Sequence, residues 1–256
     1  MKELSLEEAL VQGSNNYCTT KIQEFVKPMV VRGVTSKSEI VECQKMQRDF
    51  YYIDTGYLGN FPSPGNTSGK KIWHRVVKND LQHTAGKDVD TDRWKLLQTQ
   101  DPRLEWQGWK KHNKKILLVL PNPKACRYYD IDCDTWIAET VEKIKTYSNL
   151  AIEIRVKGAR SQRNHGYSIY NAFDSGVYAT VSFNSIASLE SVLYGIPAFV
   201  SVPCAASTLA STDLSTLRDP FKPNLKDITT MCKTLAYGQF THEEIANGTA
   251  WKILNK

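Results

Sequence analysis

The sequence of 256 residues predicts an α/β protein with a parallel sheet, and three observations carry that prediction. Residues 180–201 have the pattern of a strand, a short polar loop, a helix, a Gly-Ile-Pro turn and a second strand, which is one βαβ unit. Strand patterns alternate with helix patterns in both halves of the chain, as is typical of parallel sheets. A basic stretch at 110–115 marks a shift in composition. We therefore expect a domain boundary there.

In the first half, helical spacing of apolar residues predicts helices at 3–11 and 36–47. Runs of β-branched and aromatic residues predict strands at 29–34 and 50–58. Residues 72–112 show no clear period, so we interpret them as mixed helix and loop.

The second half is more regular. A buried strand is expected at 115–121, followed by an amphipathic helix at 134–147 with Asp134 as its N-cap. Thr241 and Glu244 have the spacing of a capping box that opens the last helix. The other expected elements are strands at 150–157, 176–183 and 195–201, and helices at 167–173, 225–237 and 241–254.

The composition is that of a globular protein, with 41% hydrophobic and 23% charged residues. No apolar run approaches the roughly 18 residues of a membrane span, and the first ten residues are too acidic for a signal peptide. We therefore expect a cytoplasmic protein without a membrane partner. The six cysteines form no CxxC pair, which argues against structural zinc, and we expect free, mostly buried thiols. They are Cys18, Cys43, Cys126, Cys133, Cys204 and Cys232.

The net charge of +6 fits a polyphosphate ligand, including nucleic acid. The chain lacks a Walker loop and the GxGxxG, HExxH and GxSxG motifs, so common ATPases, dinucleotide enzymes, zinc proteases and serine hydrolases have no support. We expect no bound metal.

Polar residues follow the ends of successive strands in the second half. Arg155 and Lys157 lie at the end of one strand, and Asn184 and Ser185 follow the next one. Because the carboxyl ends of parallel strands share one edge, these residues are expected to bind a nucleotide, with phosphate also on the exposed amides of the next helix. Glu190 would accept hydrogen bonds from ribose hydroxyls. The alternative is that all of these residues are solvated or cap the sheet.

In the first half, Asp54 follows a strand and precedes Thr-Gly, where it could serve as a general base on a hydroxyl. The same residues would also fit a turn that caps the next helix. Trp73, His74 and Arg75 combine an aromatic ring, a titratable ring and a cation, which suits phosphate contact or base stacking. A core position for the tryptophan is the alternative.

The segment SFNSIASLESVLYGIPAFV (182–200) resembles the C-terminal nucleotide-sugar motif of GT-B glycosyltransferases. With DFYYIDTGYLGN, WHRVVKNDLQHT, DRW and LAYGQFTHEEIANGTAWKIL, nearly the whole chain resembles a group of small bacteriophage-type glycosyltransferases. The resemblance implies two Rossmann-like halves facing a cleft, 1–112 on the acceptor side and 113–256 on the nucleotide-sugar side. The final helix would cross back to the first half.

The resemblance also implies roles for individual residues. The donor, a UDP-sugar in our prediction, would contact Arg155, Lys157, Asn184, Ser185 and Glu190. Asp54, or in its place His74, would be the catalytic base. Neither a metal nor another cofactor is expected, because cationic side chains and helix amides stabilise the departing diphosphate in this fold.

Phage enzymes of this fold commonly modify hydroxymethylated pyrimidines in DNA, so the resemblance favours double-stranded DNA as partner and the host cytoplasm as location. Tyr57, Trp73, Arg75 and Arg93 would then contact the DNA and the base extruded from it. Two alternatives stay open. One is a polysaccharide or small-glycan acceptor, and the other is a non-catalytic protein that binds DNA or a nucleotide.

Overall fold

The computed structural model describes residues 4–60, 72–111, 114–156 and 169–256, which divide into two compact units. The first unit contains residues 1–83, 89–100 and 234–256, and the second contains 84–88 and 101–233. The division thus differs from the predicted boundary between residues 112 and 113. Backbone hydrogen bonds explain part of the difference, because the amides of Gln107 and Lys110 donate to the carbonyls of Leu193 and Gly195 in the second unit.

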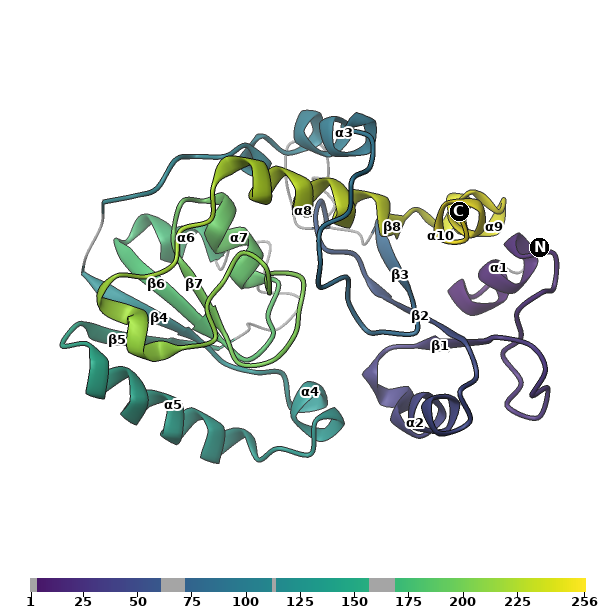
Figure 1. The fold of residues 1–256 in the computed structure, drawn as a ribbon, viewed down its shortest axis with the longest axis horizontal. Coiled ribbons are helices and arrows are strands. Elements are labelled where there is room, and N and C mark those ends of the chain that lie inside the picture. Colours follow the sequence, from purple (N-terminus) through teal and green to yellow (C-terminus); the bar gives the residue numbers. More distant parts are fainter. Residues whose placement is uncertain (1–3, 61–71, 112–113, 157–168) are drawn as a thin grey trace. The chain divides into compact units, whose positions relative to one another are not determined.

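The first unit contains a four-stranded sheet in the order β1-β2-β3-β8 (Figure 1). β1 (Met29–Arg32) runs parallel to β2 (Phe50–Thr55), and η1 (Val34–Ser36) and α2 (Lys37–Lys45) connect them. β3 (His74–Lys78) is antiparallel to both β2 and the short β8 (Gln239–Phe240). The first sheet is therefore mixed, and the parallel pairing expected of the first half is confirmed only for β1 and β2.

β3 lies in the region that we interpreted as mixed helix and loop. Its sequence, His-Arg-Val-Val-Lys, has only two apolar residues, so it gives no strand period. Arg75 is nevertheless only 9% exposed. A buried arginine in a strand hides the alternation from which strands are recognised.

Helices α1 (Leu6–Gly13), α9 (His242–Ala246) and α10 (Thr249–Leu254) pack on one face of this sheet (Figure 1). The apolar cluster beneath them includes residues of β1, β2, β3 and β8. The predicted helix at 241–254 is two helices, because the chain breaks at Gly248, whose φ is +83°. The capping box of Thr241 and Glu244 is confirmed.

The second unit contains a sheet in the order β5-β4-β6-β7, and each pair of neighbours is parallel. This confirms the parallel sheet predicted for the second half. The strands are β4 (Lys115–Val119), β5 (Ala151–Arg155), β6 (Val177–Ser182) and β7 (Ala198–Val200).

Helices cover both faces of this second sheet (Figure 1). α5 (Cys133–Tyr147) and η4 (Leu214–Arg218) lie on one face, over a cluster that includes Ile116, Leu118 and Val181. α6 (Ile169–Asp174) and α7 (Ala187–Leu193) lie on the other. Polar side chains at the ends of these strands are therefore held between rigid layers.

Four further elements lie among the described residues. They are α3 (Asp92–Gln100), η2 (Pro102–Leu104), α4 (Pro123–Tyr128) and α8 (Leu225–Tyr237). Within the described part of the chain, we find no helix able to cross a bilayer.

Two expectations about α5 and the cysteines need correction. The N-cap of α5 is Asp132, whose carboxylate accepts from the amide of Thr135, and Asp134 lies inside the helix. Cys126 and Cys133 form a disulfide, so they are not free thiols. The other four cysteines are free and buried, as expected.

Candidate functional site

The strand pairings of the second sheet align its carboxyl ends in one row. Val119 pairs with Arg155 on one side and with Ser182 on the other, and Ser182 pairs with Val200. From β4 the chain continues to β5 on one side, and from β6 it continues to β7 on the other. The edge between β4 and β6 is therefore a topological switch point, the position at which open α/β sheets bind ligands. We call the residues at the carboxyl ends of β5, β4, β6 and β7 the rim, and the loop 183–186 after β6 the rim loop.

Arg155 belongs to the rim. Its partner Val119 lies in the cluster beneath α6 and α7, and neighbours in register share a face, so Arg155 projects toward α7. Burial lowers the pKa of the Arg155 guanidinium, while the carboxylates of Glu190 and Glu153 act in the opposite direction. An arginine remains protonated at neutral pH. Arg155 is thus a partly desolvated cation under the influence of the α7 carboxylate.

Glu190 is the centre of a charged cluster on this face. It lies on α7 and is only 5% exposed. Its carboxylate acts electrostatically on Arg155, Arg103 and Tyr170, and burial together with this negative charge raises the pKa of Tyr170. The carboxylate can accept hydrogen bonds from hydroxyl groups of a ligand, and the two guanidinium groups can bind its phosphate groups.

This cluster also contains Asp101, Arg103 and Tyr170, which were not predicted from the sequence as site residues. Arg103 donates two hydrogen bonds to the Asp101 carboxylate, of 2.8 and 2.7 Å. Its guanidinium lies 4.6 Å from the centre of the Tyr170 ring. The hydrogen bond with Asp101 raises the pKa of Arg103. The only sequence signal was Asp-Pro-Arg, in which Asp101 caps η2.

The loop after β6 differs from the expected anion cradle. The Ser185 amide donates to the Ser182 hydroxyl, and the Ala187 amide donates to the Ser185 hydroxyl, both at 3.2 Å. Ser182 also bonds Ser188 across the β6–α7 interface, at 2.8 Å. The expectation that these amides are exposed for phosphate is therefore wrong, because the chain's own serines already occupy them. Ser185 caps α7.

The other predicted donor residues have different outcomes. Asn184 is half-buried in the rim loop. Lys157 lies outside the described residues. Two surface hollows of about 310 and 270 Å³ lie elsewhere, one beside β1 and one beside Tyr178 and Asn149. The candidate site therefore rests on side-chain placement and not on either hollow.

In the first unit, Asp54 is the residue before the last one of β2, and its carboxylate is held from several directions. One oxygen accepts from the Tyr52 hydroxyl at 2.9 Å and from Arg75 at 3.2 Å, and the other accepts from the Thr55 amide at 2.7 Å. The Asp54 side chain is 36% exposed and that of Arg75 11%. The structure thus presents an oriented, partly open carboxylate.

The environment of Arg75 is unusually aromatic. Its guanidinium lies 5.5 Å from the Tyr52 ring centre and 5.4 Å from that of Tyr57. Burial acts to lower the pKa of Arg75, but Tyr57, Asp54 and Tyr52 outweigh it and the net shift is upward. Burial raises the pKa of Tyr57 to about 12. Arg75 is therefore a permanent counter-charge for Asp54.

His74, the alternative base, lies on the opposite face of the sheet. The register pairs Asp54 with Arg75 and Thr55 with His74. Cross-strand partners share a face and successive residues alternate, so Asp54 and His74 point to opposite sides. They are separate candidates and cannot act together on one atom.

The residues expected to contact DNA are buried or paired with other residues of the described chain. Tyr57 and Trp73 are 1% and 5% exposed, and neither offers a ring face on which a base could stack. Gly56 allows a close approach, as expected, but its neighbours are Trp73 and Gln239 of the same unit. Arg75 is committed to Asp54.

Arg93 is also a structural residue. It pairs with Glu244 at 2.6 Å and donates to the carbonyls of Ala236 and Gln239. The geometry therefore gives no support to DNA contact by Arg93, Tyr57, Trp73 or Arg75, and that expectation stays a prediction. The local sequence could not distinguish buried cations and rings from exposed ones.

Comparisons with known proteins add little to this geometry. No protein-family model matches the chain, and no curated protein matches it. Among solved structures, it is similar to the β-Kdo 2,4-transferase of KpsC from Thermosulfurimonas dismutans, with a TM-score of 0.48 and 11% identity over 83% of this chain and 80% of that one. It is also similar to the β-Kdo 2,7-transferase of the same KpsC, with a TM-score of 0.44 and 13% identity over 90% and 85% of the two chains. Likenesses of this size do not assign a reaction.

Proposed function

We propose that this chain is a glycosyltransferase that binds a nucleotide-sugar donor, a UDP-sugar in the first instance, at the rim of the second sheet. The observation that supports the proposal is the row of strand ends: Arg155 ends β5, next to β4 of the switch point, and the Glu190 carboxylate of α7 acts electrostatically on it. The resemblance of residues 182–200 to the GT-B donor motif supports the same assignment.

The proposed roles follow from charge and position. Arg155 binds the diphosphate, because a partly desolvated cation forms strong charge-assisted hydrogen bonds with phosphate oxygens. Glu190 accepts hydrogen bonds from the ribose hydroxyls, and Asn184 contributes an amide from the rim loop. Arg103 holds Tyr170 and balances the Glu190 charge. Cations of the chain would stabilise the departing diphosphate, with no metal in the proposed mechanism.

Asp54 is the proposed catalytic base. Transfer of the sugar breaks its bond to the diphosphate, forms a bond to an acceptor oxygen, and requires removal of the proton from that oxygen. The Asp54 carboxylate is kept in one orientation by Tyr52, Arg75 and the Thr55 amide, and it remains partly open. These features suit a base that must face one hydroxyl.

The binding proposal is tested by titrating UDP into the intact protein by calorimetry. We expect Arg155→Ala to weaken UDP binding about tenfold or more, because each lost charge-assisted hydrogen bond costs about 1.5–3 kcal/mol. Lys145→Ala is the matched control, since it removes one positive charge from an exposed pair on α5. Equal UDP affinity in all three proteins would refute the site.

The acceptor requires a separate experiment. The net charge of +6 and the resemblance to phage-type enzymes support a hydroxymethylated pyrimidine in DNA, although the buried residues above no longer contribute to that argument. Nucleotide sugars should be screened against hydroxymethyl-pyrimidine duplexes and oligosaccharides, with products identified by mass. A sugar-sized mass on the nucleoside supports the DNA acceptor, and one on the oligosaccharide supports the glycan acceptor. DNA binding without UDP binding or turnover would support a non-catalytic protein.

A further inference from the structure

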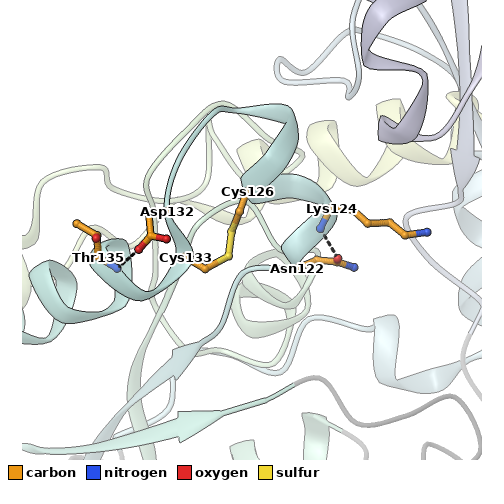
Figure 2. Close-up of a disulfide and its surroundings, with 6 residues drawn as sticks. All are labelled: Asn122, Lys124, Cys126, Asp132, Cys133 and Thr135. Atoms are coloured by element: carbon orange, nitrogen blue, oxygen red, sulfur yellow. Dashed lines mark hydrogen bonds between the residues drawn. A yellow bond between two sulfur atoms is a disulfide. The ribbon is translucent and has the colours of Figure 1, made fainter.

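The Cys126–Cys133 disulfide joins α4 to the first residue of α5 (Figure 2). The two cysteines are seven residues apart, and each helix has its own N-terminal cap. The Asn122 side chain accepts from the Lys124 amide, and Asp132 accepts from the Thr135 amide. The disulfide therefore fixes the turn between the helices and is not required to start either of them.

The two cysteines of the disulfide differ in solvent exposure. Cys126 is 4% exposed, whereas Cys133 is half-buried at the start of α5. The other four cysteines are buried and unpaired with one another. Because Cys133 is the more exposed residue, we expect a reagent in solution to reach the disulfide from its side, and the other four cysteines are thiols. Attack on a disulfide depends on such access.

The turn that the disulfide closes packs against the rim. The Tyr129 ring lies 5.3 Å from the Phe183 ring, and Trp136 of α5 lies 5.7 Å from the same ring. Trp136 also donates to the Ser201 hydroxyl, which follows β7, at 3.1 Å. Phe183 directly precedes Asn184 and is 3% exposed. The position of the rim loop therefore depends on the α4–α5 turn.

We propose that Cys126–Cys133 is a reversible thiol–disulfide site, reduced by a dithiol, whose oxidised state holds Phe183 and the rim loop in place. The effect on the rim is independent of ligand, while its consequence for donor binding rests on the proposed function. Four unoxidised thiols in the same chain fit a protein in which one pair is oxidised selectively.

The thiol–disulfide exchange needs no reactant other than the dithiol. One thiolate of the dithiol attacks the Cys133 sulfur, the sulfur–sulfur bond breaks, and its electron pair leaves with Cys126, which takes up a proton. The second thiol then attacks the mixed disulfide at the reductant's own sulfur and releases Cys133. Two electrons and two protons pass to the protein, and the reductant becomes a cyclic disulfide.

The first measurement follows reduction in the native protein. The intact chain is equilibrated in millimolar dithiothreitol without denaturant, and thiols at Cys126 and Cys133 are then quantified by alkylation and mass spectrometry. We expect both to be labelled, and the disulfide to re-form when the reductant is replaced by oxidised glutathione. A disulfide that persists until the protein is denatured would overturn the reversible site.

The second measurement follows the rim loop by hydrogen exchange. We expect amides at 183–185 to exchange about tenfold faster in the reduced protein and in a Cys126→Ser/Cys133→Ser variant, because local opening becomes easier. Cys43→Ala, which removes a buried thiol of the first unit, should keep the full redox response. Unchanged exchange at 183–185 on reduction would overturn the link to the rim.

UDP titration of both redox states separates this inference from the proposed function. Weaker UDP binding in the reduced state, by about tenfold if the rim opens as expected, would support both. A redox-dependent change in exchange without UDP binding in either state would refute the donor site and leave the redox site standing. UDP binding of equal strength in both states would overturn the regulatory consequence.

Discussion

Asp54 has a structural role beside the catalytic role that we propose for it. Its carboxylate neutralises Arg75, whose side chain is 11% exposed between two tyrosine rings. A buried cation without a partner would be strongly unfavourable. The same contacts that keep Arg75 in the strand also fix the direction of the Asp54 carboxylate. Its proposed catalytic role and its structural role therefore depend on the same contacts, and a test substitution must keep the shape of the side chain.

Asp54→Asn retains the size of the side chain and removes its charge. We expect turnover of a nucleotide sugar to fall by about 10²–10⁴-fold, because an amide cannot take the proton of the acceptor hydroxyl. UDP affinity should be unchanged, since the second unit holds the donor in our proposal. Steady-state kinetics and calorimetry measure the two quantities. Turnover equal to that of the wild type would exclude Asp54 as base.

At the scale of elements, Arg93 joins α3 to the segment that carries β8 and α9. It donates to the carbonyls of Ala236 and Gln239 and pairs with Glu244. Burial acts to raise the pKa of Glu244, but the hydrogen bonds from Arg93 and the Thr241 amide outweigh it, and the pKa lies below its ordinary value of 4.5. The pair is thus stabilised as long as Glu244 is ionised.

This shift predicts a pH-dependent contribution to stability. A carboxylate with a lowered pKa in the folded state stabilises the protein above its unfolded pKa, and the contribution is lost as the pH falls through the folded value. We expect Glu244→Gln to lower the unfolding free energy by about 1–3 kcal/mol at pH 7. The difference from the wild type should shrink below about pH 4.

Urea unfolding at several pH values measures this contribution. Glu142→Gln is the control, because Glu142 pairs with Lys145 on the exposed face of α5 and should change stability by less than about 0.5 kcal/mol. A Glu244→Gln effect that is constant from pH 7 to pH 3 would contradict the charge-based explanation.

The close contact of α1 with the turn between α9 and α10 leads to a second prediction at the scale of elements. A methyl group on Gly13 would overlap the carbonyl oxygen of Ile245, which is backbone and cannot move aside as a side chain can. Gly13→Ala should therefore destabilise the first unit by about 1–3 kcal/mol. By helix propensity alone, the same change would be favourable.

Gln12→Ala in the same helix is the comparison for Gly13→Ala. Gln12 is exposed, and its weak hydrogen bond to the Ala246 carbonyl is 3.4 Å long. Its replacement should leave the urea midpoint nearly unchanged. A Gly13→Ala protein as stable as the wild type would show that α1 can shift away from α9 without cost.

At the scale of the whole molecule, the sequence predicted the second unit better than the first. Parallel strands with short connections are local patterns, and their carboxyl ends must share an edge, so Arg155 and Ser182 could be placed before their pairings were known. β3 could not be predicted, because Arg75 is buried by tyrosine rings and a carboxylate that come from other segments.

The candidate site was predictable to a similar degree. Arg155 and Glu190 followed from the strand-end argument, but Arg103 is brought to Glu190 by a segment distant in sequence. The serines after β6 could have bound either a ligand or their own amides, and only the fold shows the second. The disulfide was not predicted, because its cysteines do not have CxxC spacing and because free thiols are expected in the cytoplasm.

If the second unit binds the donor, as we propose, UDP should stabilise that unit more than the first unit. Saturating UDP, at about 100 times its dissociation constant, should stabilise the unit that binds it by about 2.7 kcal/mol. Hydrogen exchange should therefore slow in β4, β6 and α7, whose ends form the rim. Amides of β1 and β2 should show a smaller change, because they belong to the other sheet. Protection centred on β1 and β2 would place the nucleotide in the first unit and remove Arg155 from the donor site.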